Sequence, residues 1–380
     1  MFKKKQKLLL ITLLAAIILF LVFEKGFLAG ISPKVSPYKS FKLLGSVIGL
    51  VKSEYIVKAD AEKTMRGALK GLIDSLDMLS SYLDKENVAK HSELQKRQFH
   101  DTGMILSKSF GAFPIVVGVV ENSPAEKSGL KIGDTISRLD GQSTLSMSLT
   151  ETQLLFKSPT KKPVSLKIMR DIETPELTVE REMLFDKPFS FSQLSGTSGV
   201  LTIHYLYPPC INSIVKEVVP AVKSLKRTLI LDLRNCSEGS VDEALELINL
   251  FLKAEKIGYF EKHKGEKEML SASKEPVLEN TPLIIWVNQA TIGPAEAVAA
   301  VLQEMRQAKI IGIPTPGLAA TQQLFPLEDG SALLLTTGIF SPKSGKKLWK
   351  KGIKPDIQLD LQDQKFSTYA KSTQDALSRL

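Results

Sequence analysis

The chain is poor in cysteine and histidine, and both shortages exclude whole classes of protein. Its 380 residues include only two cysteines, Cys210 and Cys236, so a framework of disulfides cannot hold the fold together. Whether these two form a single bridge depends on geometry that the sequence leaves open, and we expect two free, partly buried thiols. The four histidines follow no ligand or cofactor motif, so we expect no metal and no cofactor.

The chain also lacks an arginine-rich stripe with interleaved aromatic residues, although its formal net charge is +9. Residues 1–25 carry five lysines against one glutamate, which accounts for +4 of that charge. A second basic group lies near the C-terminus and consists of Lys343, Lys346, Lys347, Lys350, Lys351 and Lys354. We therefore expect no nucleic-acid binding, and we interpret the second group as a solvated loop or one that leans on anionic lipid.

Charged residues are absent from the run Leu8–Phe23 (LLLITLLAAIILFLVF), which follows the basic segment Lys3–Lys7. This pattern is typical of a segment that enters a membrane with its basic end in the cytoplasm. Phe27 and Ala29 match a signal-peptidase site poorly. We expect residues 1–30 to be an uncleaved, single-pass anchor in the cell membrane, with the rest of the chain on the extracytoplasmic or periplasmic side.

Residues 38–97 have helical periodicity. Apolar residues recur at spacings of three and four, which predicts a helix with one buried stripe made of Leu43, Leu44, Val47, Ile48 and Val51. A second helix is predicted over Ala61–Leu79. We expect the residues of both segments to pack against other parts of the protein, and neither segment contains a catalytic or ligand-binding motif.

Residues 98–172 change to the pattern of a small barrel. Strands are predicted at Pro114–Val120, Thr135–Asp140 and Val164–Met169, a helix at Ser146–Phe156, and an exit strand at Leu177–Leu184. Short strands with one late helix fit a PDZ-like β-barrel module.

Residues 173–361 alternate between apolar strands and helices, as expected of an α/β core. Strands are predicted at Val200–His204, Thr228–Leu233, Leu283–Asn288, Ile310–Gly312 and Ser331–Thr337, with helices at Val241–Leu252 and Pro294–Ala308. Residues 362–380 form a C-terminal tail with a closing helix predicted over Phe366–Leu380. The whole chain is therefore expected to have an α+β multidomain fold.

Several ordered motifs resemble one family, the carboxy-terminal processing (tail-specific) peptidases. They are ALKGLIDSLDMLSSYLD (68–84), GMIL (103–106), SPAEKSGLKIGD (123–134), LDLRNCSEGSVDEA (231–244), QQLFPLEDGSALLLTTGIFSPKSG (322–345) and GIKPD (352–356). The resemblance runs from about Tyr38 to the end, with Met78 and Leu79 in place of the family's Pro-His. It implies a helical N-terminal region, a PDZ module and an α/β peptidase core of the crotonase or ClpP type.

The resemblance also implies a site for peptides. In the family, backbone N–H groups of a PDZ loop hold the free C-terminus of a substrate while the peptide adds as a strand. Here that loop is Gly103, Met104, Ile105 and Leu106. The alternative is that Gly103 is an ordinary glycine at the start of a strand.

The residues that cut peptides in the family have no counterparts here. The family uses a serine nucleophile and a lysine base, and the aligned positions hold Gly293 and Leu318. Gln322, which supports the lysine in the family, is present. Of the oxyanion hole, Gly239 survives in the turn 236–239, whereas Pro294 has no N–H to donate.

Three residues near these positions carry groups that could replace the serine. Thr291 and Ser237 carry hydroxyls, and Cys236 carries a thiol on the oxyanion turn, but the sequence pairs none of them with a base. His204 is expected to be a satisfied core residue.

The sequence therefore predicts a pseudopeptidase that binds protein C-termini, or a partner subunit in a homo- or hetero-oligomer, without cleavage. An active endopeptidase with an unconventional nucleophile and a purely structural envelope protein remain the alternatives.

Overall fold

A computed structural model describes residues 37–57, 60–94, 99–195, 198–224, 228–361 and 364–378. The chain divides into two compact units, Met1–Met65 and Arg66–Leu380. The predicted anchor, residues 1–30, lies outside the described residues. In the part of the chain that the structure describes, no helix is both long enough and apolar enough to cross a membrane.

Helix α2 (Pro37–Glu54) forms where periodicity predicts it, but its apolar stripe is not buried. The exposed fraction of the side chain is 67% for Leu43, 44% for Leu44 and 47% for Val47. Ile48 and Val51 are half-buried. The expected burial of the stripe is therefore wrong for the structure of this chain, because periodicity reports that a helix has an apolar face and cannot report what covers it.

Helix α3 (Ala61–Asp74) is shorter than predicted, since the chain turns after Asp74. The Asp74 carboxylate accepts a hydrogen bond from the Tyr82 N–H, and the Asp77 carboxylate accepts from the N–H groups of Leu79 and Ser80. These bonds replace the next helical turn with a tight loop. Strand β1 (Ser81–Leu83) and helix α4 (Lys85–Leu94) follow.

The PDZ-like module is an antiparallel sheet in the order β2-β3-β4-β6-β7, with β5 paired to β4. Its elements are β2 (Met104–Ser107), β3 (Ile115–Val119), α5 (Pro124–Lys127), β4 (Thr135–Leu139), β5 (Gln142–Ser143), α6 (Leu149–Phe156), β6 (Val164–Met169) and β7 (Glu176–Val179). Ser148 and Glu151 cap α6 reciprocally, which fixes where this helix begins. The sheet extends to Val179, beyond the predicted module boundary at residue 172.

The peptidase-like core is a six-stranded sheet in the order β17-β14-β13-β10-β9-β8. Its strands are β8 (Phe189–Ser195), β9 (Ser198–Ile203), β10 (Leu229–Asp232), β13 (Leu283–Val287), β14 (Lys309–Gly312) and β17 (Ile357–Gln358). Only β8 pairs antiparallel; the other pairs are parallel. Parallel strands need both faces covered, which explains their unbroken apolar runs.

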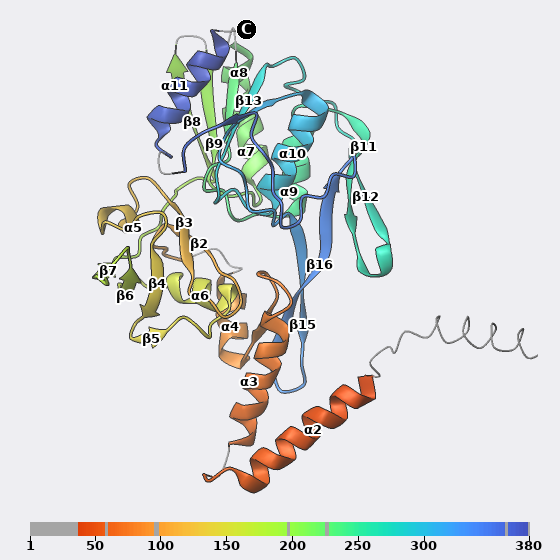
Figure 1. Ribbon diagram of the computed structural model, residues 1–380. Helices are drawn as coiled ribbons and strands as arrows, with labels where there is room; N and C mark the ends of the chain where they lie inside the picture. The colour runs from red at the N-terminus through yellow and green to blue at the C-terminus, as the bar shows by residue number, and fades with distance from the viewer. Residues whose placement is uncertain are drawn as a thin grey trace, which may run out of the picture. The chain divides into compact units, whose positions relative to one another are not determined.

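Helices cover the two faces of this sheet (Figure 1). On one face lie α7 (Cys210–Glu217), α8 (Val219–Ser224), α9 (Val241–Asn249) and α10 (Pro294–Arg306); on the other lies α11 (Phe366–Leu377). Neighbouring residues of β10 pack on opposite faces of the sheet. Leu231 belongs to the larger hydrophobic cluster, on the side of α7 to α10, and Ile230 belongs to the smaller cluster, on the side of α11. Tyr369 of α11 is fully buried beneath Trp286, so the predicted closing helix is an integral part of the core.

A third sheet, of five antiparallel strands, was largely missed by the sequence patterns. It comprises β1, β11 (Ala254–Glu261), β12 (Lys267–Ala272), β15 (Ala320–Pro326) and β16 (Ala332–Pro342), and a short 3-10 turn lies at His263–Gly265. The predicted strand Ser331–Thr337 is the first part of β16, which forms a long hairpin with β15 (blue in Figure 1). Strand β1 joins this sheet although its residues lie in the region predicted to be helical.

Candidate functional site

The candidate site lies at the carboxyl ends of β10 and β13, which are neighbouring parallel strands. Open α/β sheets place ligand sites at this edge because the loops that follow the strands meet there. The turn after β10 and the loop after β13 are tied together: the Asn235 N–H donates to the Asn288 side-chain oxygen (3.1 Å), and the Ile292 N–H donates to the Cys236 carbonyl (3.0 Å). The sheet thus brings together the two segments in which the sequence places the oxyanion turn and the nucleophile position.

Gly293 directly precedes α10, and its backbone has φ 65° and ψ −121°. Residues other than glycine enter this region only at an energetic cost. A Cβ atom added at Gly293 would meet nothing within 4 Å. A side chain therefore has room at this position, and backbone strain is what limits substitution. Pro294 occupies the first helical position, where the missing N–H costs the helix nothing.

Glu296 organises the site, a role that the sequence analysis did not anticipate. Its carboxylate is fully buried and accepts hydrogen bonds from the Thr315 hydroxyl (2.5 Å) and from the N–H groups of Gly317 (2.7 Å) and Leu318 (2.6 Å). The Gly293 N–H donates to the same group (3.3 Å). Burial raises the pKa of Glu296, and these hydrogen bonds oppose the rise.

One carboxylate therefore accepts hydrogen bonds from the backbone at residues 293 and 318, the two positions that the sequence resemblance singles out. Leu318 is 5% exposed, and its N–H donates to Glu296. Gln322 lies on β15, where its amide nitrogen donates to the Leu79 carbonyl (2.7 Å). The only sequence signal for Glu296 was an acidic residue in the first turn of an otherwise apolar helix.

Gly239 is required by close packing of two backbones. A Cβ atom there would lie 2.5 Å from the Leu206 Cβ. The two residues form a parallel bridge, with the Leu206 N–H donating to the Glu238 carbonyl (2.9 Å) and the Ser240 N–H donating to the Leu206 carbonyl (2.7 Å). This contact explains the glycine of the turn without any catalytic role.

Cys236, the candidate thiol nucleophile, is fully buried in the core cluster together with Cys210. Burial raises the pKa of the Cys236 thiol far above its ordinary value, and it raises that of Cys210 to about 12. The nucleophilic form of cysteine is the thiolate, so both sulfurs are held in the unreactive form. Neither cysteine is in a disulfide.

Thr291 and His204 are also occupied structurally. The Thr291 hydroxyl donates to the Leu233 carbonyl (2.8 Å) and accepts from the Asn288 N–H (3.0 Å). The His204 ring stacks on Phe185 with 3.8 Å between ring centroids, and burial lowers the pKa of His204 to about 4. Ser237 is half-buried on the oxyanion turn.

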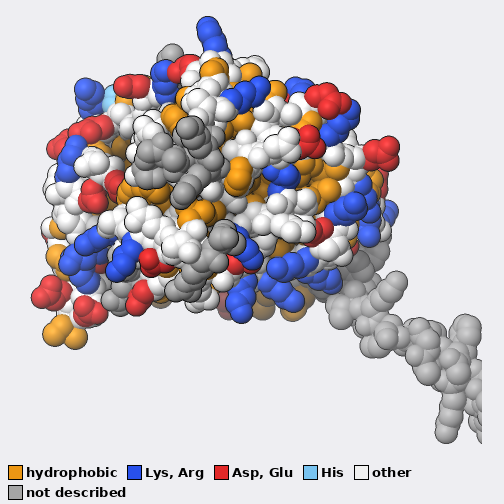
Figure 2. All heavy atoms as spheres, turned by 90° about the horizontal axis from the view of Figure 1, so that it is seen from above, with side chains coloured by type: hydrophobic (Ala, Val, Ile, Leu, Met, Phe, Trp, Pro, Cys, Tyr) orange, Lys and Arg blue, Asp and Glu red, His pale blue; other side chains and the backbone are white. Residues whose placement is uncertain are grey.

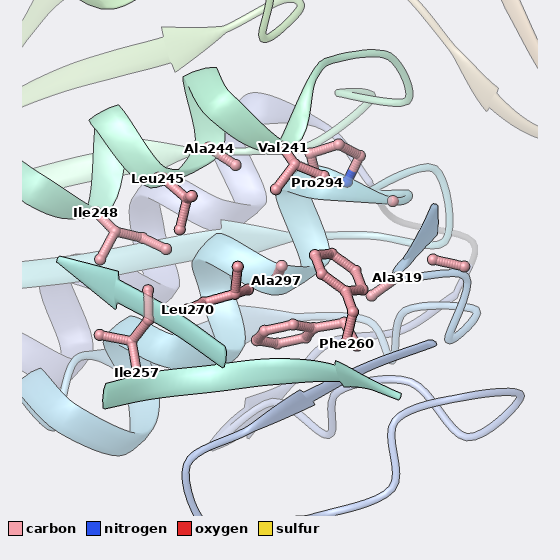
Figure 3. Close-up of a pocket in the computed structure, with 13 residues that line it drawn as sticks. Val241, Ala244, Leu245, Ile248, Ile257, Phe260, Leu270, Pro294, Ala297 and Ala319 are labelled. Carbon is pink, nitrogen blue, oxygen red and sulfur yellow. The ribbon is translucent and has the colours of Figure 1, made fainter. Parts of the chain in front are cut away.

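An apolar cavity opens beside Gly293 and Pro294. Its free space is about 20 Å³, room for about one water molecule, so the cavity is nearly filled by its own lining. Helices α9 and α10 and strands β11, β12, β15 and β16 contribute this lining, which is Val241, Ala244, Leu245, Ile248, Ile257, Phe260, Leu270, Gly293, Pro294, Ala297, Ala319, Ala320 and Phe340. Figure 3 shows these side chains converging from several elements on one space, with Pro294 beside Val241.

In the PDZ module, the predicted peptide-binding residues Gly103, Met104, Ile105 and Leu106 lead into and form β2, the edge strand of the sheet. The Met104 and Leu106 side chains are buried in the module's core, so only backbone groups of these residues can meet a ligand. Gly103 has φ 86°, and a Cβ there would lie 2.3 Å from the Ser123 Cβ. Steric need therefore explains the glycine, whether or not its loop binds a carboxylate.

The PDZ module packs directly on the candidate site. A Cβ added at Gly118 of β3 would lie 2.6 Å from the Ala290 Cβ, and the Asn235 side-chain nitrogen donates to the Val119 carbonyl (3.3 Å). Lys157, at the end of α6, forms an ion pair with Glu238. Glu238 directly precedes Gly239 on the turn 236–239, and a lysine of the PDZ module thus pairs with its charge, a contact that the sequence does not predict.

No group of three or more His, Cys, Asp or Glu side chains suited to a metal ion occurs among the described residues.

Comparisons with known proteins agree with this architecture. The chain matches a family model described as "Peptidase family S41" over residues 204–359 and one described as "PDZ domain" over residues 115–170. It is 30% identical over 373 residues to the carboxy-terminal processing protease CtpA of Bacillus subtilis (strain 168), spanning 95% of this chain and 78% of that one. It is 27% identical over 330 residues to a carboxy-terminal-processing protease of Bartonella bacilliformis, spanning 85% and 76%.

Among solved structures, the fold is similar to that of a photosystem II D1 C-terminal processing protease, with a TM-score of 0.72 and 21% identity over 87% of this chain and 90% of that one. The α+β multidomain fold class predicted from the sequence, with its PDZ module and α/β core, is thereby confirmed. This chain belongs to peptidase family S41, the C-terminal processing peptidases, and carries a PDZ domain.

Proposed function

We propose that this protein is a pseudopeptidase that binds the free C-termini of other proteins and does not cut them. The observation that carries the proposal is the pair of positions held by Glu296: a glycine where the family has its nucleophile and a leucine where it has its base. Glycine has no attacking atom and leucine cannot take a proton. Pro294 removes a backbone donor as well.

The burial of two of the three alternative nucleophiles, Cys236 and Thr291, supports this proposal over an active enzyme. Cys236 lies in the apolar core and Thr291 has both hydrogen bonds of its hydroxyl satisfied, so neither offers an exposed nucleophile beside a base. Each would need the site to rearrange before it could attack a peptide bond.

The edge position of β2 supports capture of a peptide, because an edge strand offers backbone groups to an added strand. A PDZ domain suits protein C-termini as ligands, and we expect tails with an apolar last residue. A partner subunit whose C-terminus is free would be captured in the same way.

The test uses the full chain in detergent or nanodiscs, with a fluorescent tail peptide that ends in an apolar residue. We expect binding in the micromolar range, roughly typical of strand addition, and no product on long incubation. The same peptide with an amidated C-terminus should not bind, because the carboxylate is the group that the loop holds. Equal affinity for both peptides would indicate a structural protein without this ligand.

Activity is tested in the same preparation with serine-directed fluorophosphonates and a mass-spectrometric search for cleavage products. We expect neither labelling nor cleavage. If cleavage occurs, with contaminating peptidases excluded, the proposal is wrong, and its loss in Cys236→Ala would identify the thiol as the nucleophile.

We further propose that residues 1–30 anchor the protein in the cell membrane and that the remainder lies outside the cytoplasm. The support is the uncharged run Leu8–Phe23 behind a basic segment. The protein should sediment with membranes and resist extraction by salt. Release from intact cells of a soluble form beginning near Gly30 would contradict the anchor.

A further inference from the structure

A lysine-rich loop between β16 and β17, which we call the lysine loop (residues 343–354), carries side-chain charges that the site described above does not use. Its basic residues are Lys343, Lys346, Lys347, Lys350, Lys351 and Lys354, and all six are exposed. The ion pairs found among the described residues include none of these six side chains. Their charges therefore face solvent and are available to a partner.

The backbone of the lysine loop is held in place, so the charges form a fixed array. Leu348 and Ile353 are each 1% exposed and belong to the main core cluster. The Lys350 N–H donates to the Gly317 carbonyl (2.8 Å), and the Gly352 N–H donates to the Leu348 carbonyl (2.8 Å). Gly352 is needed there, since an added Cβ would lie 1.7 Å from the Thr315 carbonyl oxygen. Binding to this array costs little backbone ordering.

Few carboxylates offset the charge. Glu304 accepts hydrogen bonds from the N–H (2.8 Å) and the hydroxyl (2.6 Å) of Ser344, and Asp356 accepts from the Ile310 N–H (2.8 Å). With these two acids counted against six lysines, the local charge is 6 − 2 = +4. Figure 2 shows one face of the molecule, on which Lys and Arg side chains lie among Asp and Glu. The loop is thus a local excess of positive charge.

The composition of the loop indicates what kind of anion it meets. It contains lysine and no arginine, and lysine acts as a point charge without the paired geometry that singles out one carboxylate or phosphate. Trp349 lies half-buried among the lysines. A tryptophan with lysines on both sides is typical of a surface that rests on lipid headgroups, where the indole body and its N–H meet different environments.

We propose that the lysine loop binds the anionic phospholipid headgroups of the membrane that holds the anchor. This inference rests on the location proposed above, because a tether keeps the loop near one bilayer at a high effective concentration. Soluble polyanions would have to compete with that bilayer from solution. The contact would restrict how the peptide site is presented to tails arriving along the membrane surface.

The two tryptophans of the chain allow a direct test. Trp286 is fully buried and serves as the unquenched reference, and Trp349 is the reporter. The full chain is placed in nanodiscs of phosphatidylcholine, or of phosphatidylcholine with phosphatidylglycerol, each containing brominated lipid that quenches indole fluorescence on contact. We expect at least about twofold stronger quenching in the anionic discs, and its loss in high salt, which screens such contacts. The variant Trp349→Phe should lose the quenchable signal.

The charge itself is tested by Lys346→Gln, Lys347→Gln, Lys350→Gln and Lys351→Gln in one variant. A matched control makes the same four-charge change at exposed lysines elsewhere, Lys161, Lys162, Lys216 and Lys223. The first variant should quench in anionic discs no more than in neutral ones, and the control should behave as the unchanged protein does. Tail-peptide binding, measured in the same discs, should survive in both variants.

The outcomes separate this inference from the proposals on which it rests. Failure of the chain to enter discs contradicts the anchor, and failure to bind peptide contradicts the proposed capture. Equal quenching in both kinds of disc, or none in either, overturns the lysine-loop inference. A change in Trp349 emission on adding soluble polyphosphate, without quenching by anionic discs, also overturns it and identifies the loop as a site for soluble anions.

Discussion

The PDZ loop depends on backbone groups, whereas a peptidase site depends on side-chain atoms. The loop at Gly103–Leu106 presents backbone groups at the edge of a sheet, and its buried side chains only shape it. The peptidase site needs particular side-chain atoms, and Gly293 and Leu318 have neither a hydroxyl nor an amine. A function that uses backbone groups survives many substitutions. A function that needs two particular side chains is lost when either of them is replaced. Glu296 holds the backbone of the loops around positions 293 and 318, and this frame does not depend on which side chains those positions carry.

The largest effect is expected from rebuilding the missing chemistry. Only the triple change Gly293→Ser, Pro294→Ala and Leu318→Lys should cleave a tail peptide detectably, because a nucleophile without a base gains almost nothing. The restored N–H alone is worth roughly 10²–10³ in rate once an oxyanion forms. Product formation is followed by mass spectrometry.

The matched control for that variant is Gly293→Ala, Pro294→Ala and Leu318→Lys, which differs by one hydroxyl. Equal turnover in both triple variants would show that cleavage does not use residue 293. The buried lysine at 318 is expected to cost several kcal/mol, so folding of both variants is checked by thermal unfolding first.

Next in size is the effect of blocking the PDZ loop. Gly103→Ala places a Cβ against Ser123 and demands φ 86° of alanine, so the loop must shift. We expect affinity for the tail peptide to fall roughly 10–100-fold, the worth of a charged hydrogen bond, in fluorescence anisotropy.

Gly111→Ala is the control for this change. Gly111 also has a positive φ, 71°, but an added Cβ meets nothing within 4 Å. Both variants carry similar backbone strain, and only Gly103→Ala should lose peptide. Similar losses in the two would mean that general destabilisation, and not the loop, weakens binding.

The frame of the peptidase site is tested with Glu296→Gln. The N–H groups of Gly317 and Leu318 donate to different oxygens of Glu296, and glutamine keeps only one oxygen, so one of these buried donors then faces an amide nitrogen and is left unsatisfied. We expect a loss of about 3 kcal/mol in the free energy of unfolding, measured with urea. Glu304→Gln, on the exposed side of the same helix, should change it by less than about 1 kcal/mol.

The pH dependence of that difference has a definite sign. Burial raises the pKa of Glu296 in the folded state above its ordinary value of 4.5, so the folded protein binds this proton more tightly than the unfolded chain does. The contribution of this group is therefore greatest at or below pH 4.5 and is lost as pH rises through the raised pKa. Glu296→Gln should remove this dependence; stability that instead rose with pH because of Glu296 would contradict the assigned direction.

The smallest effect is expected from Gly293→Ala. The added methyl has room, so only the backbone strain at φ 65° and ψ −121° opposes it, at about 1–3 kcal/mol. Gly71→Ala, at a helical glycine with equally open surroundings, should instead be neutral or stabilising. Comparison of the two unfolding free energies isolates the strain, and equal values would show that the loop relaxes.

Much of the fold was readable in the sequence because its signals are local. The apolar runs predicted β10 and β13 within a residue or two, and α10 begins at Pro294 as predicted. These strands are buried on both faces, so their apolar character is continuous. The strands β11, β12 and β15 escaped prediction since they carry many exposed polar residues, and pairing with β16 is what makes them strands.

By itself, the sequence determined which atoms are present at positions 293, 294 and 318, because a missing hydroxyl, N–H or amine cannot be supplied by folding. Tertiary structure alone decided that Glu296 holds two of these positions, that Lys157 neutralises Glu238, and that the stripe of α2 is exposed. Each of these depends on residues far apart in the chain, or on what covers a surface. Composition and periodicity carry no information about such contacts, because they report only on neighbours along the chain.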